Sequence, residues 1–300
     1  MKKFPNKKVL ILGIDSIVGS ALYNAINIAG GDVYGTSRRG GSDHSFLDVT
    51  FALDKWPDMP EVDSMIVCAS LGKLAQCQSD PALSYAVNVE GLEKAVRKYK
   101  TSRTQVVFFS SYHVFNGRKA FVEECEMPEP QCVIGRHKAQ AEEIVLNEQG
   151  FVIRVTKVID PLYPRFTDWA LKLRKGQIVE AYSNLFCSLV PLDSVIEAVL
   201  VAIREGWKNI IHLSGPEETS YYDIARMLAK KLGCSEDLVV PVQGKIDEMG
   251  VHYSHSTLQV SKVIKNMKLN LPDTEAVIRE WIKGYKDWYN LRSDQRVPHE

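Results

Sequence analysis

The chain has 300 residues, of which 37 are Lys or Arg and 37 are Asp or Glu, so its formal net charge is zero. This balance excludes an electrostatic case for binding nucleic acid or an anionic membrane surface. No apolar run approaches the roughly 18 residues that cross a bilayer, and the six cysteines contain no CxxC pair, so we expect a cytoplasmic protein with reduced thiols and no metal site.

The first predicted unit, residues 8–29, is a buried strand, a tight turn and a helix. Residues 9–12 are all apolar, as in a parallel strand covered on both faces, and a helical apolar pattern begins at Val18. Gly13 and Gly19 bracket the turn between them. The free amides at such a helix start favour an anion, which in dinucleotide-binding folds is a pyrophosphate.

Ser16 stands where the usual glycine fingerprint has its middle glycine. Taken alone, this stretch is therefore as compatible with an ordinary strand–helix turn as with a nucleotide site. If the turn holds a dinucleotide, the residues that we expect to contact it are Gly13, Ser16, Ile17 and Gly19.

A second strand is predicted over residues 32–36, and Ser37, Arg38 and Arg39 follow it. An acidic residue at this place typically bonds the adenosine ribose hydroxyls and favours NAD. Two guanidinium groups offer donors to a phosphate instead. The sequence therefore predicts NADP(H) in preference to NAD(H), and the alternative is a solvated basic turn.

Two further stretches carry candidate cofactor contacts. Asp48 and Val49 follow an apolar pair, and Asp48 either accepts a bond from the adenine amino group or caps the short helix that follows. A third buried strand, predicted over residues 63–70, ends in small side chains that include Ala69 and Ser70. Small side chains at the carboxyl end of a strand leave room for a ligand at the edge of a sheet.

The rest of the first half continues to alternate strands and helices. The predicted elements are helices over residues 81–98 and 134–147 and strands over residues 104–109 and 151–155. This alternation predicts an α/β protein with a doubly wound parallel sheet of the Rossmann type. We assign residues 1–160 to this dinucleotide-binding domain.

Beyond residue 160 the pattern loosens, and we expect residues 161–300 to form mainly a smaller substrate lobe, with some segments returning to the sheet. The predicted elements there are helices over residues 166–175, 194–205, 220–232 and 274–289 and a strand over residues 210–213. The aromatic side chains of the last helix are expected to be packing surface.

Four stretches resemble a known family: SSYHVFNG at 110–117, SDPALSYAVNVEGLEKA at 79–95, GRHKAQAEE at 135–143 and HLSGPEETSYYDIAR at 212–226. Over nearly its whole length the chain is similar to the extended short-chain dehydrogenases/reductases, most of all to the dTDP-4-dehydrorhamnose reductase branch. The resemblance implies a nicotinamide cofactor, a nucleotide sugar as substrate, and a homodimer formed through the helices at 81–98 and 134–147.

The resemblance also assigns catalytic residues where the motifs match. It implies that Lys138 holds the nicotinamide ribose and lowers the pKa of a tyrosine four residues earlier, on the same helix face. It implies that Ser111 bonds the carbonyl or hydroxyl of the substrate. The position four before Lys138 is Ile134, however, and isoleucine has no proton to give. Loss of a general acid typically costs roughly 10²–10⁴-fold in rate.

Three functions are compatible with this departure. The favoured one is an NADP-dependent reductase or epimerase that acts on a nucleotide-linked sugar with a relocated acid. Tyr112, His113 and Tyr163 are the candidates for that acid, His113 because histidine titrates near neutrality. The second is a non-catalytic cofactor-binding regulatory or scaffold subunit, like the regulatory subunit of methionine adenosyltransferase, which Ile134 favours. The third is a reaction that needs no tyrosine, such as a lyase step or a reduction in which water supplies the proton.

Overall fold

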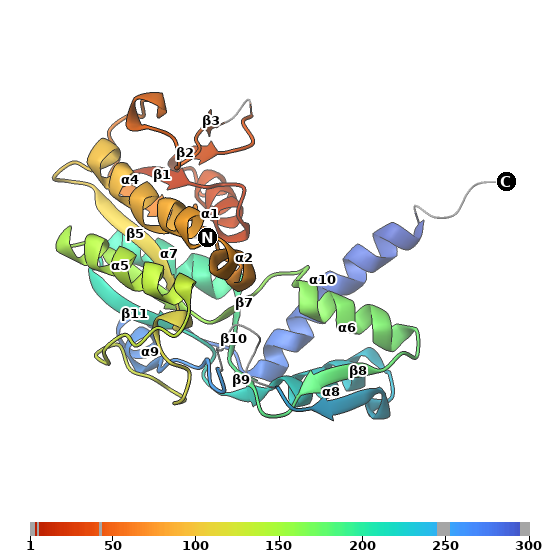
Figure 1. The fold of residues 1–300 in the computed structure, drawn as a ribbon. Coiled ribbons are helices and arrows are strands. Elements are labelled where there is room, and N and C mark those ends of the chain that lie inside the picture. Colours follow the sequence, from red (N-terminus) through yellow and green to blue (C-terminus); the bar gives the residue numbers. More distant parts are fainter. Residues whose placement is uncertain (1–3, 5, 42–43, 245–252, 295–300) are drawn as a thin grey trace.

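The computed structural model describes residues 4, 6–41, 44–244 and 253–294. Figure 1 shows a larger body built on a central sheet and a smaller body of helices and short strands beside it. The helix α10 (Thr274–Asp294) runs through the smaller body.

The central sheet has seven strands, and every neighbouring pair in it is parallel. Their spatial order is β11 (Asn209–Leu213), β6 (Phe151–Val155), β5 (Gln105–Ser111), β4 (Ser64–Val67), β1 (Lys8–Leu12), β2 (Asp32–Ser37) and β3 (Ser45–Phe46). The chain winds outward from β1 in both directions, so the order reverses between β1 and β4. This arrangement confirms the predicted doubly wound sheet.

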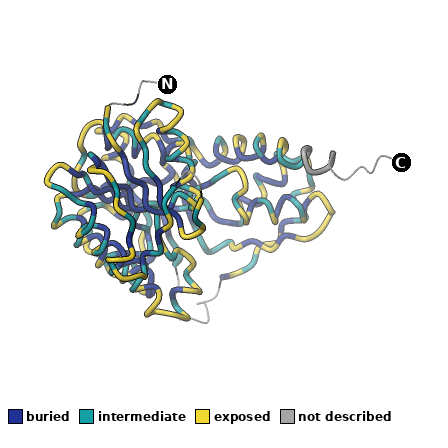
Figure 2. The backbone as a smooth tube through the Cα atoms, turned by 90° about the horizontal axis from the view of Figure 1, so that it is seen from above, coloured by how far each residue is buried: buried dark blue, intermediate teal, exposed yellow. Residues whose placement is uncertain are grey.

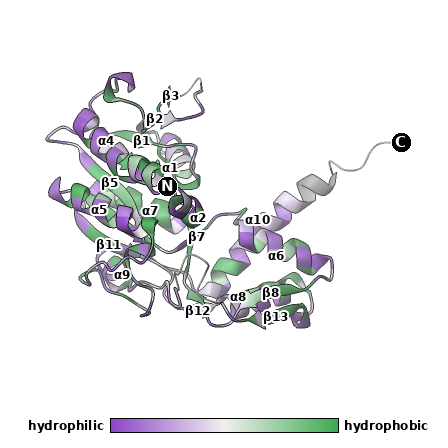
Figure 3. Ribbon diagram, in the orientation of Figure 1, coloured by the Kyte–Doolittle hydropathy of each residue, from purple (hydrophilic) through white to green (hydrophobic). Residues whose placement is uncertain are grey.

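Helices cover both faces of this sheet. One face is covered by α1 (Ile17–Ile28), α7 (Leu192–Glu205) and α9 (Ser261–Met267). The other face is covered by α4 (Gly91–Tyr99) and α5 (Val133–Asn147). Val9 and Ile11 pack with the first set, whereas Leu10 and Leu12 pack with the second. Two-sided burial explains why β1 is an uninterrupted apolar run, and Figure 3 shows the hydrophilic residues of α4 and α5 on their outer sides.

The smaller body has a core of its own. It contains α6 (Pro164–Arg174), α8 (Tyr221–Leu232), α10 and the parallel pair β8 (Val179–Tyr182) and β13 (Val239–Val242). Trp281 of α10 packs on Phe166 and stacks on Tyr285 at 4.9 Å between ring centroids. The expectation that these aromatic side chains form packing surface is confirmed, and Figure 2 shows the buried side of α10 facing this body.

Short strand pairs connect the two bodies. They are β7 (Lys157–Ile159) with β10 (Leu189–Pro191), which is parallel, and β9 (Phe186–Cys187) with β12 (Thr219–Ser220), which is antiparallel. Strand β7 follows β6 after a single residue, so it carries the chain from the central sheet toward the smaller body.

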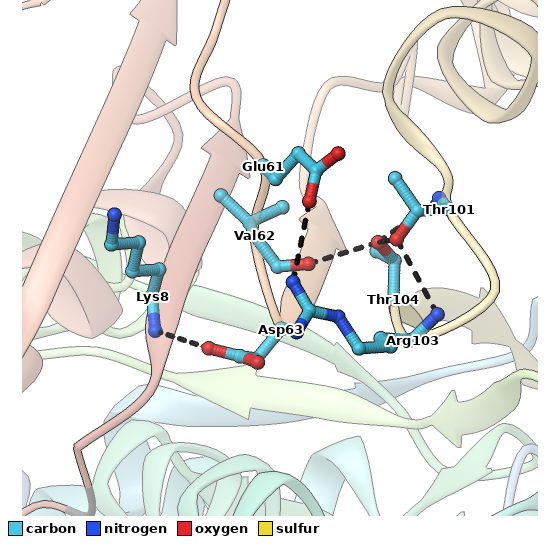
Figure 4. A network of polar contacts seen from close by, with 7 residues as sticks. All are labelled: Lys8, Glu61, Val62, Asp63, Thr101, Arg103 and Thr104. Carbon is cyan, nitrogen blue, oxygen red and sulfur yellow. Dashed lines mark hydrogen bonds and ion pairs between the residues drawn. The ribbon is translucent and has the colours of Figure 1, made fainter.

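The amino-terminal edge of the sheet is tied by polar contacts (Figure 4). The amide of Lys8 donates to Asp63 at 2.9 Å, Thr104 donates to the carbonyl of Val62 at 2.9 Å, and Arg103 pairs with Glu61 at 3.2 Å. These contacts lie at the starts of β1, β4 and β5. The opposite edge, where these strands end, is left for the loops described below.

The sequence prediction is wrong at several boundaries. Helix α2 (Leu74–Ser79) was not expected, and the single helix predicted at 81–98 is α3 (Pro81–Tyr85), a π turn η2 (Ala86–Glu90) and α4. Strand β4 ends at Val67 and not at residue 70, whereas β5 runs on to Ser111. Three short 3-10 turns complete the elements: η1 (Leu53–Lys55), η3 (Tyr112–Val114) and η4 (Glu236–Leu238).

Among the described residues, none of the helices combines the length and the apolar character that a bilayer crossing requires. In the same part of the chain, no three His, Cys, Asp or Glu side chains come together in a way that could hold a metal ion.

Candidate active site

The turn between β1 and α1 is shaped by two glycines and a serine. Gly13 has a φ of +89°, and a Cβ there would lie 2.7 Å from the amide nitrogen of Ala69. A Cβ on Gly19 would collide with the carbonyl oxygen of Gly13. Ser16 donates to that carbonyl at 2.9 Å and accepts from the amide of Gly19 at 3.0 Å, so it is the N-cap of α1. The residue that breaks the glycine fingerprint therefore stabilises the turn.

A cavity of about 460 Å³ lies above this turn, at the point where the strand order reverses. Doubly wound sheets bind ligands at this point. The predicted cofactor residues that line it are Gly13, Ser16, Ser37, Arg38, Arg39, Asp48, Val49, Ala69 and Ser70. Three predicted cofactor residues do not line the cavity: Ile17, Gly19 and Lys138. Gly19 packs tightly against Gly13 and Ser16 inside the turn, so it shapes the turn and does not face the cavity.

The cavity also has lining residues that the sequence reasoning missed: Asp15, Thr36, Leu47, Cys68, Leu71, Lys73, Gln76, Leu83 and Val87. Lys73 and Gln76 come from the end of the loop after β4 and from the unexpected helix α2. In the sequence, the one feature that indicated a role for these two residues in the cavity was their position shortly after Ser70.

The basic side of the cavity is exposed. Arg39 has a side chain that is 82% exposed and lies 3.8 Å from the carboxylate of Asp15. Its backbone amide donates to the buried Ser37 hydroxyl at 3.0 Å, which fixes the turn after β2. Arg38 is also exposed. Both guanidinium groups are thus available to a ligand without breaking a buried contact.

Asp48 closes a local turn. One of its carboxylate oxygens accepts from the amide of Thr50 at 2.9 Å and from the Thr50 hydroxyl at 2.7 Å. The N-cap residue of the following 3-10 turn is Ala52, so the alternative that Asp48 caps that helix is wrong.

Asn88 holds the loop after β4 from within the π turn. Its side-chain oxygen accepts from the Ser70 hydroxyl at 2.7 Å and from the amide of Leu71 at 3.0 Å, and its nitrogen donates to the carbonyl of Leu71 at 3.1 Å. π turns inside helices recur at functional sites. Nearby, burial raises the pKa of Cys68 to about 12, so that thiol stays neutral.

Lys138 of α5 and Ser111, the last residue of β5, are both absent from the cavity lining. Lys138 is 6% exposed and donates to the carbonyl of Phe109 at 2.8 Å. Burial lowers its pKa to about 8, and the nearby thiol of Cys68 and carboxylate of Glu142 only partly oppose this shift. Ser111 accepts from the amide of His113 at 3.3 Å and caps η3.

Ile134, at the position where the resemblance implies a tyrosine, is packed in an apolar cluster. Its buried neighbours in the cluster are Cys77, Cys132 and Val133, and the partly buried Leu74 packs against them. Leu74 and Cys77 belong to α2. Both the side chain at position 134 and the residues that surround it are therefore mainly apolar.

His113 does not have the properties that made it a candidate acid. Burial, and then the charge of Lys157, lower its pKa to about 3, so the imidazole is neutral at physiological pH. Within the described part of the chain its Nδ1 atom is buried without a hydrogen-bond partner. The expectation that His113 titrates near neutrality is wrong, because the sequence did not show its burial.

Lys157 is the functional candidate that the sequence reasoning missed. Its Nζ donates to the phenol oxygen of Tyr112 at 2.8 Å. The signal in the sequence was a pair of charges, Arg154 and Lys157, in the otherwise uncharged run 151–159. Arg154 is explained by a buried two-point ion pair with Glu142 at 2.7 and 2.9 Å, whereas Lys157 has no such explanation.

The fold and this edge of the sheet define a nucleotide-binding α/β protein of the doubly wound class. Residues 7–286 match the RmlD substrate binding domain family, and the chain belongs to that family. The class expected from the sequence, an oxidoreductase of the extended short-chain dehydrogenase/reductase type, is thereby confirmed.

Individual relatives are distant in sequence. The probable low-salt glycan biosynthesis reductase of Haloferax volcanii is 22% identical over 241 residues, which are 77% of this chain and 80% of that protein. The dTDP-4-dehydrorhamnose reductase of Bacillus anthracis, solved in complex with NADP, is 18% identical, with a TM-score of 0.80 over 92% of this chain and 98% of that one. MoeE5, solved with UDP-glucose and NAD, is 18% identical, with a TM-score of 0.74 over the same shares.

Proposed function

We propose that this protein is an NADP(H)-dependent reductase or epimerase that acts on a nucleotide-linked sugar, with an atypical active site in which Ile134 stands in place of the family's tyrosine. The observation that carries the proposal is the cavity above the β1–α1 turn, whose rim after β2 is Ser37–Arg38–Arg39 and carries no acidic residue. The solved neighbours with NADP and with UDP-glucose and NAD support the classes of cofactor and substrate.

The residues of the cavity fit a dinucleotide. Gly13 leaves no room for a side chain of its own, and the amino-terminal end of α1, which begins at Ile17, would turn the positive end of its dipole toward a diphosphate. Asp48 and Val49 would flank the adenine. Beyond them, Ala69 and Ser70 line the path toward β5.

The remaining contact would come from Lys138, which would hold the ribose next to the nicotinamide. When bound, the nicotinamide supplies or accepts the hydride of the oxidation–reduction.

The preference for the phosphorylated cofactor rests on charge. Two exposed guanidinium groups beside a buried serine can donate several charge-assisted bonds to a phosphate on the adenosine ribose. Asp15 lies within 3.8 Å of Arg39 and lowers the net positive charge there. We therefore assign the larger share of the preference to Arg38.

For the substrate, we propose that Ser111 bonds the reacting oxygen of the sugar and that the body formed by α6, α8 and α10 binds the nucleotide end. Residues 1–160 would then supply the cofactor site and residues 161–300 most of the substrate site. We also propose a homodimer through the helical segment at 81–98 (α3, η2 and α4) and α5, which sedimentation equilibrium of the purified protein would test.

The first test is calorimetric. NADPH is expected to bind more tightly than NADH, and the double substitution Arg38→Ala/Arg39→Ala is expected to weaken NADPH binding by about a hundredfold or more, because each lost charged bond is worth about 1.5–3 kcal/mol. Binding of NADH should change little. Arg103→Ala is a matched control, since Arg103 is an exposed arginine at the opposite edge of the sheet.

Equal affinity for both cofactors would contradict the NADP(H) assignment, and absence of binding would contradict the whole proposal. The second test is oxidation of NADPH in the presence of 4-keto sugar nucleotides. Tight cofactor binding without turnover on any of them would favour the regulatory-subunit alternative.

A further inference from the structure

A buried lysine–phenol pair lies beyond the carboxyl ends of two central strands. Ser111, the last residue of β5, is in register with Val155, the last residue of β6. Tyr112 comes one residue after Ser111, and Lys157 comes two residues after Val155. The pair therefore lies at the same edge of the sheet as Ser111, where this fold class binds its ligands.

The contact within the pair is well defined. The Lys157 ammonium donates to the Tyr112 phenol oxygen at 2.8 Å and lies 4.9 Å from the centre of the ring. The ring is 8% exposed and packs in a cluster with Val114, Phe115 and Leu258, which leaves it little freedom to rotate. Because the ammonium supplies the donor, the hydrogen of the phenol is free to be given to another acceptor.

Lys157 lacks the partner that a buried cation normally has. In the described part of the chain, no carboxylate lies within salt-bridge distance of its Nζ, and its hydrogen-bond partner is the Tyr112 phenol. Burial by itself would lower the pKa of Lys157, but interaction with the hydroxyl groups of Tyr112, Tyr221 and Tyr163 outweighs it, and the pKa is raised. A cation held in this way without a carboxylate is costly, which is typical of functional positions.

We propose, as a refinement that rests on the proposed function, that Tyr112 is the proton donor that replaces the missing tyrosine and that Lys157 is its positioning residue. The family arrangement, a lysine beside a phenol, would then be formed between two strand ends instead of within α5. Lys138 would retain only its contact to the cofactor.

The proton and electron balance of the step is simple. The carbonyl carbon of the sugar would accept a hydride, which is one proton with two electrons, from the reduced nicotinamide. The carbonyl oxygen takes the proton of the Tyr112 phenol. The phenolic O–H bond breaks and the O–H bond of the sugar alcohol forms. The phenolate is stabilised by the Lys157 ammonium, which keeps its own proton, and it recovers a proton from water.

The other candidate acids are less suitable. His113 is neutral and lies against the Tyr112 ring at 4.1 Å, so it has no excess proton to give. Burial raises the pKa of Tyr163, and its ring packs on Phe166. Tyr253 donates its hydroxyl hydrogen to the sulfur of Cys132 at 3.2 Å.

The activity test uses the full-length protein with NADPH and a 4-keto sugar nucleotide. Tyr112→Phe is expected to lower kcat by roughly 10²–10⁴-fold with little change in KM. Tyr253→Phe is the matched control, because it also removes one hydroxyl from a partly buried ring that packs against the same cluster, and it should leave kcat within about threefold. Affinity for NADPH should be the same in both variants and would show that each is folded.

The positioning role of Lys157 is tested by removing its charge and then restoring it. Lys157→Met should lower kcat and move the alkaline limb of the kcat–pH profile upward by about one pH unit or more, and Lys157→Arg should restore most of both. The other titratable groups around the pair are Tyr163, Tyr221, Tyr253, Cys187 and His113, with Arg165 stacked over Tyr221. A profile unchanged in Lys157→Met would overturn the positioning role.

A second readout does not depend on turnover. In the cofactor-free protein, ultraviolet difference titration should show one phenol whose ionisation is lost in Tyr112→Phe and moves to higher pH in Lys157→Met. Ionisation of that phenol at the same pH in the wild-type protein and in Lys157→Met would overturn the pairing.

The activity results separate the two proposals. Turnover by the wild-type protein that persists in Tyr112→Phe would overturn this inference alone. NADPH binding without turnover by the wild-type protein would overturn the reductase proposal and the proton-donor role together.

Discussion

Two regions along one edge of the sheet are built in opposite ways. The cofactor cavity is made of backbone at Gly13 and of exposed side chains such as Arg39. The region toward the carboxyl ends of β5, β6 and β11 contains buried polar groups, among them Lys138 of α5, Arg154 and His212, all at most 6% exposed. The difference teaches that the exposed side chains at the cavity rim can be changed with little effect on folding, whereas chemistry and stability are coupled toward the carboxyl ends of β5, β6 and β11.

The largest effect on stability is expected from the buried ion pair. Glu142→Ala leaves the Arg154 guanidinium, 2% exposed, without its carboxylate, and should lower the free energy of unfolding by about 3–5 kcal/mol in urea denaturation. Glu61→Ala, at the exposed pair with Arg103, should cost under about 1 kcal/mol. Similar losses for both variants would show that burial does not set the cost of breaking the Glu142–Arg154 pair.

Acid should destabilise the same buried region. Burial, then Arg154, lowers the pKa of His212 to about 3, and its tautomer is set because Arg154 donates to Nε2 and Nδ1 therefore donates to Val122. His113 is lowered to a similar pKa. Below the unfolded pKa of about 6.5 the unfolded chain binds protons that the folded chain does not, so stability falls as pH decreases toward 3.

At pH 5 this loss amounts to about 2 kcal/mol for each histidine. Thermal unfolding between pH 7 and pH 5 measures it, and His212→Gln should flatten the dependence. The opposite trend, with greater stability at pH 5, would show that the two imidazoles are accessible to protons in the folded protein.

The apolar cluster at Ile134 gives a smaller effect. Ile134→Tyr inserts a larger polar side chain against Cys77 and Leu74 and should cost about 1–3 kcal/mol of stability through overpacking. We expect no gain in NADPH oxidation, because α2 occupies the space in front of this position. A stable variant with higher kcat would show instead that the original site is still formed.

The smallest effect on stability is expected in the cavity. Arg39→Ala removes an exposed contact to Asp15 at 3.8 Å and should leave the free energy of unfolding within about 0.5 kcal/mol while weakening NADPH binding. Asp15→Asn should act in the opposite direction on NADPH affinity. A marked loss of stability in Arg39→Ala would show that the cavity is not built from exposed side chains alone.

Much of the fold could be predicted because local patterns express it. The apolar run at residues 9–12 indicates a strand covered on both faces, and the helix predicted at 134–147 begins only one residue before Ile134 in the structure. Half of the cavity lining could also be predicted, since Ser37, Asp48 and Ala69 each lie at or just after the end of a strand and parallel strands end at one edge.

The sequence by itself determined the alternation of strands and helices, the glycine-cornered turn and the basic rim, because each depends on residues close together in the chain. Only the tertiary structure decided that His113 is buried, that α2 covers Ile134, and that Lys157 meets Tyr112 across 45 positions. These are contacts between distant segments, and their burial and charge depend on packing that no local periodicity contains.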